Sequence, residues 1–228
     1  MSFNSFLFVL VFLPLTLVTY YLIAKYAPHC WAKIWLLAAS LLFYALASPY
    51  YLLVLLSSII FNLYMARSLT AHPSPALRRK VLLATGVGAN CGLLLYLKYY
   101  NFLLANINTV LGLQIPAADI ILPLGISFFT FVQIAFLVDI YRRDLLDFDL
   151  LDYLLNISFF PKLLSGPITR YREIAPQLQE KSTFAVDYDN LSRGLYLFFI
   201  GLFKKLVIAD TLALFAGSGF DQAATLSC

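Results

Sequence analysis

Charged residues are scarce in this chain of 228 residues, at 12% against the usual share of about 25% in soluble domains. A soluble protein of this length needs a charged surface, and the sequence has too few charges to form one. Histidine is scarce as well, since His29 and His72 are the only two, and neither has a metal-ligating neighbour at helical spacing. The three cysteines form no CxxC motif. We therefore expect no metal site and no disulfide framework.

Acidic residues are absent from the first 118 positions, and all twelve of them lie between Asp119 and Asp221. The same first part contains seven Lys or Arg residues, so the chain changes character near residue 119. In a membrane protein, a basic excess in short loops records the orientation of the chain. We favour that explanation over nucleic-acid binding and expect no nucleic-acid partner.

Hydrophobic residues make up 61% of the chain and are grouped in runs of about 17 to 21 residues, the length of a helix that crosses a bilayer. This pattern predicts an all-α, polytopic helical membrane protein. The first run has no basic leader and no cleavage site, which favours a retained helix over a signal peptide. The five expected membrane spans are Phe6–Ala24, Ala32–Ala47, Tyr50–Ala66, Val81–Leu97 and Ile120–Ile140.

Between these runs the sequence predicts three irregular features. Arg67–Lys80 contains two prolines and four basic residues, which is typical of a loop. Tyr99–Gln114 mixes apolar and amide side chains, which indicates a helix at the membrane interface or packed within the bundle. The sequence Pro123-Leu124-Gly125 predicts a bend within the fifth span.

The regular pattern ends after residue 144. Leu145–Asp152 carries three aspartates among leucines and predicts an amphipathic surface helix. Tyr153–Ile168 is apolar but interrupted by Pro161, Lys162 and a Ser-Gly-Pro turn, which favours a re-entrant or interfacial element. Thr169–Ser192 has mixed charge and is expected to be exposed on the cytoplasmic side.

The last hydrophobic stretch, Leu195–Leu214, contains twelve Leu, Ile, Val or Phe residues. They contribute about −4 to −7 kcal/mol to insertion, whereas Lys204, Lys205 and Asp210 oppose it by about 8 to 10 kcal/mol. As an isolated span the stretch is therefore unfavourable, unless its charges face protein, water or headgroups.

These segments predict a single membrane domain over residues 1–228. Regular transmembrane helices form residues 1–140, and amphipathic, re-entrant and final membrane segments form residues 141–228.

Basic residues alternate between successive loops. Lys25 and Lys33 flank the first loop, residues 67–80 contain four basic residues, and the fifth loop begins with Arg142 and Arg143. The second loop is uncharged and the fourth is near neutral. By the positive-inside rule, the basic loops are cytoplasmic and the N-terminus is outside.

Four sequence blocks follow one another along the chain: Phe3–Phe8 with Phe12–Pro14, Ile121–Phe131 with Val138–Arg142, Phe159–Ile168 with Arg170–Tyr171, and Gly194–Asp210. In this order the blocks resemble those of the membrane-bound O-acyltransferase (MBOAT) family, in its bacterial branch that O-acetylates alginate and related polysaccharides. The resemblance implies a multi-pass enzyme of the bacterial inner membrane without a cofactor. It further implies an acyl-CoA donor in the cytoplasm and a polysaccharide acceptor, reached through periplasmic partner acetyltransferases.

Members of this family are longer than this chain, and the histidine taken to activate the acceptor hydroxyl lies in their second half. His29 and His72 fall in none of the matching blocks. The chain thus resembles the N-terminal half of an acyltransferase, and we assign no catalytic residue. We expect the 228-residue chain alone to be inactive.

Three charged residues remain open to two interpretations. Lys204 and Lys205 are candidate substrate-binding residues that meet donor phosphates or lipid headgroups, or they extend their ammonium groups from a shallow helix to water. Asp139 is either an ordinary ion-pair partner of Arg142 or Arg143, which we favour, or a polar group at the mouth of a substrate funnel.

The alternative to an enzyme is a non-catalytic membrane protein that transports acyl groups or serves as a scaffold for partners.

The alternation of basic loops makes a prediction about topology. A reporter fused within residues 67–80 should report the cytoplasm, because positively charged loops are retained on that side of the membrane. A periplasmic signal from the same fusion would overturn the orientation inferred for the whole chain.

Overall fold

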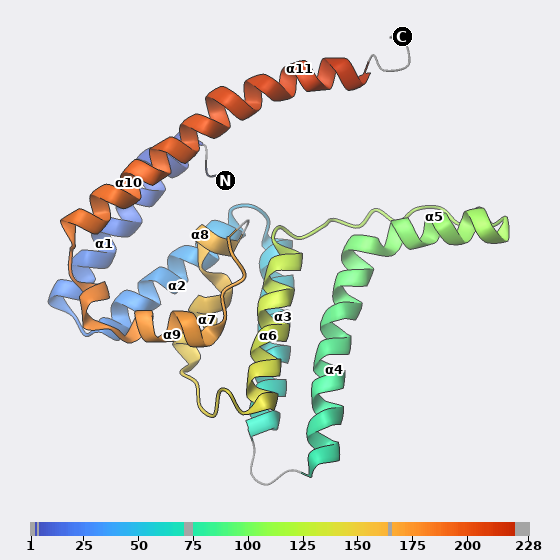
Figure 1. Ribbon diagram of the computed structural model, residues 1–228, viewed down its shortest axis with the longest axis horizontal. Helices are drawn as coiled ribbons and strands as arrows, with labels where there is room; N and C mark the ends of the chain where they lie inside the picture. Colours follow the sequence, from blue (N-terminus) through green and yellow to red (C-terminus); the bar gives the residue numbers. More distant parts are fainter. Residues whose placement is uncertain (1–2, 4, 71–74, 164–165, 222–228) are drawn as a thin grey trace.

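The computed structural model describes residues 3, 5–70, 75–163 and 166–221. Within these ranges the chain is helical, with irregular connections and no strand (Figure 1). The all-helical class is therefore confirmed, whereas His72, Leu164, Ser165 and Cys228 lie outside the described residues. The helices are α1 (Leu13–Tyr26), α2 (His29–Ala45), α3 (Pro49–Thr70), α4 (Ala76–Leu94), α5 (Tyr100–Leu111), α6 (Ile126–Arg142), α7 (Leu150–Ser158), α8 (Phe160–Leu163), α9 (Tyr171–Gln179), α10 (Tyr188–Phe203) and α11 (Asp210–Asp221).

Three helical stretches in the described part are long and apolar enough to cross a membrane. They are Phe8–Tyr26, Pro49–Thr70 and Ala76–Leu111. The second and third contain the expected spans Tyr50–Ala66 and Val81–Leu97, and the first overlaps most of Phe6–Ala24. The shorter α2, with 17 residues, is apolar as well. The fold is that of a polytopic helical membrane protein, and the number of five spans stays a prediction.

Helices α3, α4 and α6 each contact the other two and form the centre of the molecule (Figure 1). Gly86 of α4 allows a close approach, because a Cβ atom at this position would lie 2.8 Å from Cδ1 of Leu137. Phe129, Val132, Phe136 and Leu137 on α6 are almost fully buried, so the helix contributes much of the core. Close helix contact through small residues is the usual packing of membrane helices.

A pair of buried asparagines joins α3 to α4. Asn62 donates to Oδ1 of Asn90 at 3.1 Å, and Asn90 donates to Oδ1 of Asn62 at 2.7 Å. Each amide also donates to a backbone carbonyl of its own helix, of Ser58 and of Gly86. Both side chains are thus well satisfied at 0% and 2% exposure, as polar groups away from water must be.

The predicted start of the fifth span is wrong. Helix α6 begins at Ile126, and residues 113–123 form no helix, so Pro123-Leu124-Gly125 precedes a helix and does not bend one. Gly125 has φ +71°, and a Cβ there would lie 2.4 Å from the carbonyl oxygen of Leu163. Glycine alone suits this left-handed position beside another backbone. The Tyr44 hydroxyl of α2 holds this turn by donating to the carbonyl of Leu124.

The predicted surface helix at Leu145–Asp152 is also wrong. The helix here is α7, which begins at Leu150 after Asp149, whose carboxylate caps it by accepting from the backbone N–H of Asp152 at 2.9 Å. Tyr153 and Ile157 on α7 are fully buried, because the helix packs against α2 and α9. The break before α8 agrees with the expected interruption near Pro161, and the depth of this segment in the membrane stays a prediction.

The other connections differ from expectation in detail. The predicted loop Arg67–Lys80 is shorter, since α3 continues to Thr70 and α4 begins at Ala76. Its basic side chains therefore stand on helix ends. Helix α5 follows α4 through a π-helical turn and points away from the bundle (Figure 1), with Leu104 as its one buried residue. This arrangement agrees with an interfacial helix and excludes packing within the described bundle.

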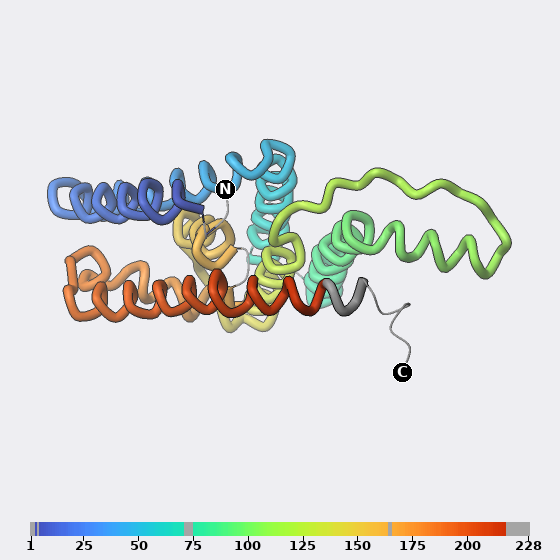
Figure 2. Tube along the Cα trace, turned by 90° about the horizontal axis from the view of Figure 1, so that it is seen from above, coloured from blue at the N-terminus to red at the C-terminus, as the bar shows by residue number. Residues whose placement is uncertain are grey.

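Helix α10, a π-helical turn (Lys204–Ala209) and α11 form one continuous helix from Tyr188 to Asp221. In the described part of this helix no residue is buried, although most of its side chains are apolar. Figure 2 shows the first part of this helix running beside α1, and Figure 1 shows α11 extending beyond the bundle.

The asparagine pair predicts a non-additive effect on stability. Asn62→Leu should lower the free energy of unfolding by about 1–3 kcal/mol, because Asn90 is left buried without its partner. The double variant Asn62→Leu/Asn90→Leu should recover most of this loss, since it removes both polar groups. Thermal unfolding of the purified chain in detergent measures the difference, and additive losses would contradict the reciprocal pairing.

Candidate functional site

Polar and charged side chains gather where α7, α8 and α9 meet α2 and α6. The first contact is an ion pair between Lys33 of α2 and Asp152 of α7, with Nζ and Oδ1 2.5 Å apart. The other carboxylate oxygen of Asp152 accepts from Nε2 of Gln179 on α9 at 2.9 Å. Asp152 is fully buried, so its charge is balanced by Lys33 where water does not reach it. The carboxylate of Asp152 on α7 thus links α7 to α2 and α9.

The second contact is built around Lys162 of α8, which is 8% exposed. Its ammonium donates to Oδ1 of Asn156 at 2.7 Å and to Oγ1 of Thr169 at 3.0 Å. Both partners are neutral, and burial lowers the pKa of Lys162 to about 8. Helix α8 lies outside the three stretches that are long enough to span a membrane.

The third contact joins α6 to α9, because Asp139 lies 3.6 Å from Nη1 of Arg170. The favoured sequence interpretation, a pair with Arg142 or Arg143, is wrong: Asp139 is 3% exposed, and its partner comes from 31 residues further along the chain. Since Thr169 and Arg170 are neighbours, this contact and that of Lys162 belong to one arrangement. We call Asp139, Asn156, Lys162, Thr169 and Arg170 the polar network.

The polar network is incompletely satisfied within the described part of the chain. Oδ2 of Asp139 and Nδ2 of Asn156 are buried without a hydrogen-bond partner, and so are atoms of Thr130, Gln133 and Tyr153 on the same two helices. Native proteins pair most such atoms with protein or ordered water. The interior between α6 and α7 therefore has unused donors and acceptors, and the network holds two cations against one carboxylate. This arrangement can orient polar or anionic groups.

The candidate substrate-binding residues Lys204 and Lys205 lie elsewhere, on the exposed continuous helix. Lys205, in the π-helical turn, forms an ion pair with Asp210, the first residue of α11. Within the described residues neither lysine shares a hydrogen bond or ion pair with the polar network. The structure therefore does not bring these two parts together, and the role of both lysines stays a prediction.

His29 does not belong to this site. His29 is exposed at the beginning of α2 and stacks on Phe184, with ring centroids 4.1 Å apart. His72 lies outside the described residues.

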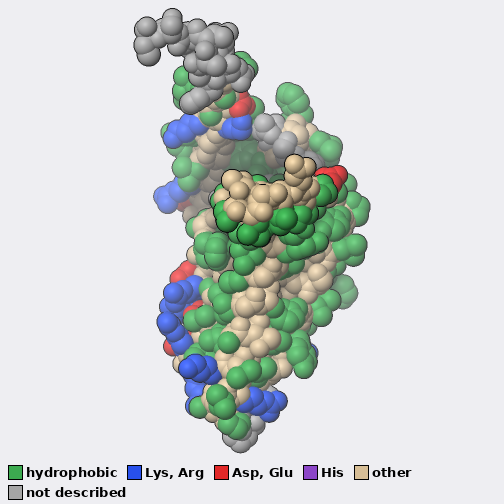
Figure 3. Space-filling model, turned by 90° about the vertical axis from the view of Figure 1, so that its right-hand side faces the viewer, with side chains coloured by type: hydrophobic (Ala, Val, Ile, Leu, Met, Phe, Trp, Pro, Cys, Tyr) green, Lys and Arg blue, Asp and Glu red, His purple; other side chains and the backbone are tan. Residues whose placement is uncertain are grey.

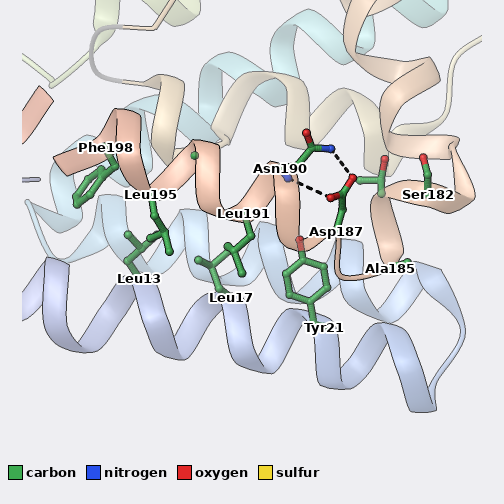
Figure 4. Close-up of a pocket in the computed structure, with 12 residues that line it drawn as sticks. Leu13, Leu17, Tyr21, Ser182, Ala185, Asp187, Asn190, Leu191, Leu195 and Phe198 are labelled. Atoms are coloured by element: carbon green, nitrogen blue, oxygen red, sulfur yellow. Dashed lines mark hydrogen bonds between the residues drawn. The ribbon is translucent and has the colours of Figure 1, made fainter. Parts of the chain in front are cut away.

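A second candidate site is an apolar groove between α1 and α10 (Figure 4). Figure 4 shows Leu13, Leu17 and Tyr21 of α1 pointing toward side chains of α10 across a hollow of about 440 Å³. The hollow is apolar at one end and has Asp187 and Asn190 at the other.

The polar network was largely missed by sequence reasoning. Lys162 stands within an apolar run, where the sequence predicts only an interruption, although a charge in such a run is the signal for a partnered, buried group. Lys33, Asn156 and Thr169 carry no comparable signal. Their partners become visible only when α2, α7 and α9 are packed together.

Comparison with known proteins gives matches in two searches. A sequence model of the membrane-bound O-acyltransferase family matches residues 126–227, which include the polar network and both lysines. No solved structure matches the chain.

Curated relatives match nearly the whole chain. A Helicobacter pylori protein named peptidoglycan O-acetyltransferase is 40% identical over 99% of this chain and 47% of its own length. A Pseudomonas aeruginosa protein named probable alginate O-acetylase AlgI is 33% identical over 96% of this chain and 42% of its own length. The Pseudomonas putida protein of the same name is 32% identical over 96% of this chain and 45% of its own. The chain thus spans about half the length of the curated relatives it matches. With these matches and its helical membrane fold, the chain belongs to the membrane-bound O-acyltransferase family.

Proposed function

We propose that the chain forms the membrane part of an O-acyltransferase that moves an acetyl or similar acyl group to a hydroxyl of a cell-surface polysaccharide. The observation that carries the proposal is the 40% identity, over 99% of the chain, with a protein named peptidoglycan O-acetyltransferase. Relatives named for alginate match the same residues at 33% identity. Their names differ in the acceptor and agree in the reaction, so the proposal is made for the polysaccharide class.

The orientation and donor belong to the same proposal. The chain lies in the bacterial inner membrane with several passes and its N-terminus outside, as a single membrane domain. The end of α3, the beginning of α4 and the end of α6 lie at one end of the bundle (Figure 1). Lys and Arg side chains gather at this end, while apolar side chains cover most of the face on the side of α4 and α5 (Figure 3). A basic end supports a cytoplasmic position.

Acyl-CoA in the cytoplasm is the proposed donor, no cofactor is involved, and periplasmic acetyltransferases are the proposed partners that deliver the group to the polysaccharide. Transfer from a thioester to a hydroxyl needs a base for the acceptor proton and donors for the developing negative charge. The residues of this chain that support the second task are Lys162 and Arg170 with the free amide of Asn156. We assign the base to none of the described residues.

A non-catalytic transport or scaffolding protein is the less favoured function. The relatives that match nearly the full chain are named for acetyl transfer, and nothing in the described fold favours a conducting path over a reaction site.

A chimera tests the proposed function. In the chimera, this chain replaces the aligned half of the Helicobacter pylori relative and is joined to the relative's other half. The chimera should restore O-acetylation of peptidoglycan, because the family blocks of this chain are then combined with the part of the protein that this chain does not cover. The measurement is the O-acetyl content of the cell wall, in a strain that lacks the native gene. The chain alone is the control and should show no turnover. A stable, membrane-inserted chimera without O-acetylation would refute the proposed function.

The candidate substrate-binding lysines can be tested in the same chimera. Lys204→Gln/Lys205→Gln should raise the KM for the acyl donor about tenfold, since a hydrogen bond to a charged group contributes about 1.5–3 kcal/mol. The kcat should change little. Asp210→Asn is the matched control, because it breaks the ion pair with Lys205 and leaves both cations in place. An unchanged KM in the double variant would contradict substrate binding, and the lysines would then only extend their ammonium groups from a shallow helix to water.

A further inference from the structure

The groove between α1 and α10 consists of two hollows that share one wall. Leu13, Leu17 and Tyr21 of α1 line both of them, together with Leu191, Leu195 and Phe198 of α10. The smaller hollow measures about 440 Å³ and the larger about 730 Å³. The two helices therefore do not pack tightly against each other. One hollow lies on each side of their line of contact, whereas protein interiors are densely packed.

The larger hollow is lined almost wholly by apolar side chains. It runs from Val9, in the π-helical turn Phe8–Phe12 that precedes α1, to Lys25 near the end of α1. This is about 24 Å of helix, more than one leaflet of a hydrocarbon core of about 30 Å. Leu10, Val18 and Phe199 in its wall are 68%, 58% and 54% exposed. In a bilayer the medium that contacts them is hydrocarbon.

Charges stand at one end of the groove only. Lys25 closes the larger hollow, and Asp187 lines the smaller one at the same end, beside Tyr21 (Figure 4). Within the described residues Lys25 forms no ion pair, and its ammonium lies 5.3 Å from the centre of the Tyr26 ring. Asp187 caps α10: one carboxylate oxygen accepts from the backbone N–H groups of Asp189 and Asn190 at 3.0 Å, and the other accepts from the Asn190 side-chain amide at 2.7 Å. The end thus offers a cation and an anion that are not paired with each other.

We propose that this groove binds one bilayer phospholipid whose headgroup carries a phosphate and a primary amine. An acyl chain lies along Leu10, Val18 and Leu22 in the larger hollow, the phosphate meets Lys25, and the amine faces Asp187. The length of the apolar wall, its exposure and the two opposite charges at one end all match an amphiphile with such a headgroup. This binding site is independent of the proposed transfer reaction.

The alternative occupant is a protein helix from a longer chain. A helix would fill the apolar wall, but an apolar helix would leave the ammonium of Lys25 without an anionic partner at this end. The charge pattern therefore favours the phospholipid.

Lipid retention by the purified 228-residue chain tests the proposal. The chain is reconstituted in nanodiscs of phosphatidylethanolamine and phosphatidylglycerol and extracted into mild detergent, and native mass spectrometry counts the lipid that stays bound. The wild type should keep one phosphatidylethanolamine per chain. Lys25→Gln should weaken retention about fivefold, the effect of one cation near a phosphate. Asp187→Asn should keep the helix cap but abolish the preference for phosphatidylethanolamine, because asparagine caps as well as aspartate.

A second pair of variants tests the groove itself. Val18→Trp fills the larger hollow and should abolish retention, whereas Leu212→Trp, at an exposed site on α11 away from the groove, should not. Circular dichroism confirms that both variants are helical. If Val18→Trp does not fold, the two charge variants decide the outcome by themselves. Equal retention of both lipids by the wild type, unchanged in Lys25→Gln, would overturn the proposal.

Discussion

Polar groups between these helices have to satisfy one another, because hydrocarbon on the outside offers no hydrogen bonds. The rest of the structure depends on this constraint. Asn62 and Asn90 meet it by exchanging hydrogen bonds between α3 and α4. Lys33 and Asp152 meet it by an ion pair that places α7 against α2. Wherever a buried polar group has found its partner, two helices are fixed in register, so the arrangement of the bundle follows from a few such pairs.

The sequence predicts the three long apolar helical stretches well, because length and hydropathy decide them. It fails where local composition and packing disagree. Aspartates among leucines at 145–152 predict a surface helix, but Asp152 is a buried partner of Lys33 and Asp149 is a helix cap. The high hydropathy of Ile120–Leu124 predicts that the helix begins near Ile120. The helix begins only at Ile126, after Gly125 has adopted a left-handed conformation against the backbone of Leu163, and hydropathy does not show this contact between distant residues.

The candidate site could be predicted only in part. The matching blocks predict which region carries function, and the family match at residues 126–227 covers the polar network. The network itself could not be derived, since Asn156 and Thr169 are ordinary residues until folding places them beside the ammonium of Lys162. Lys204 and Lys205 stand out in the sequence because they oppose insertion. Of the three charges, two balance each other in the Lys205–Asp210 pair, so the helix is less unfavourable in a membrane than separate charges suggest.

The ion pair between Lys33 and Asp152 has a consequence for biosynthesis. Its two partners are 119 residues apart, and ribosomes add roughly 5–20 residues per second, so Lys33 waits about 6 to 24 s for Asp152 to be made. During that time α2 carries an unmatched ammonium, which a long side chain can hold at the headgroup level. We therefore expect the end of α2 that carries Lys33 to stay near the membrane surface until α7 has been made.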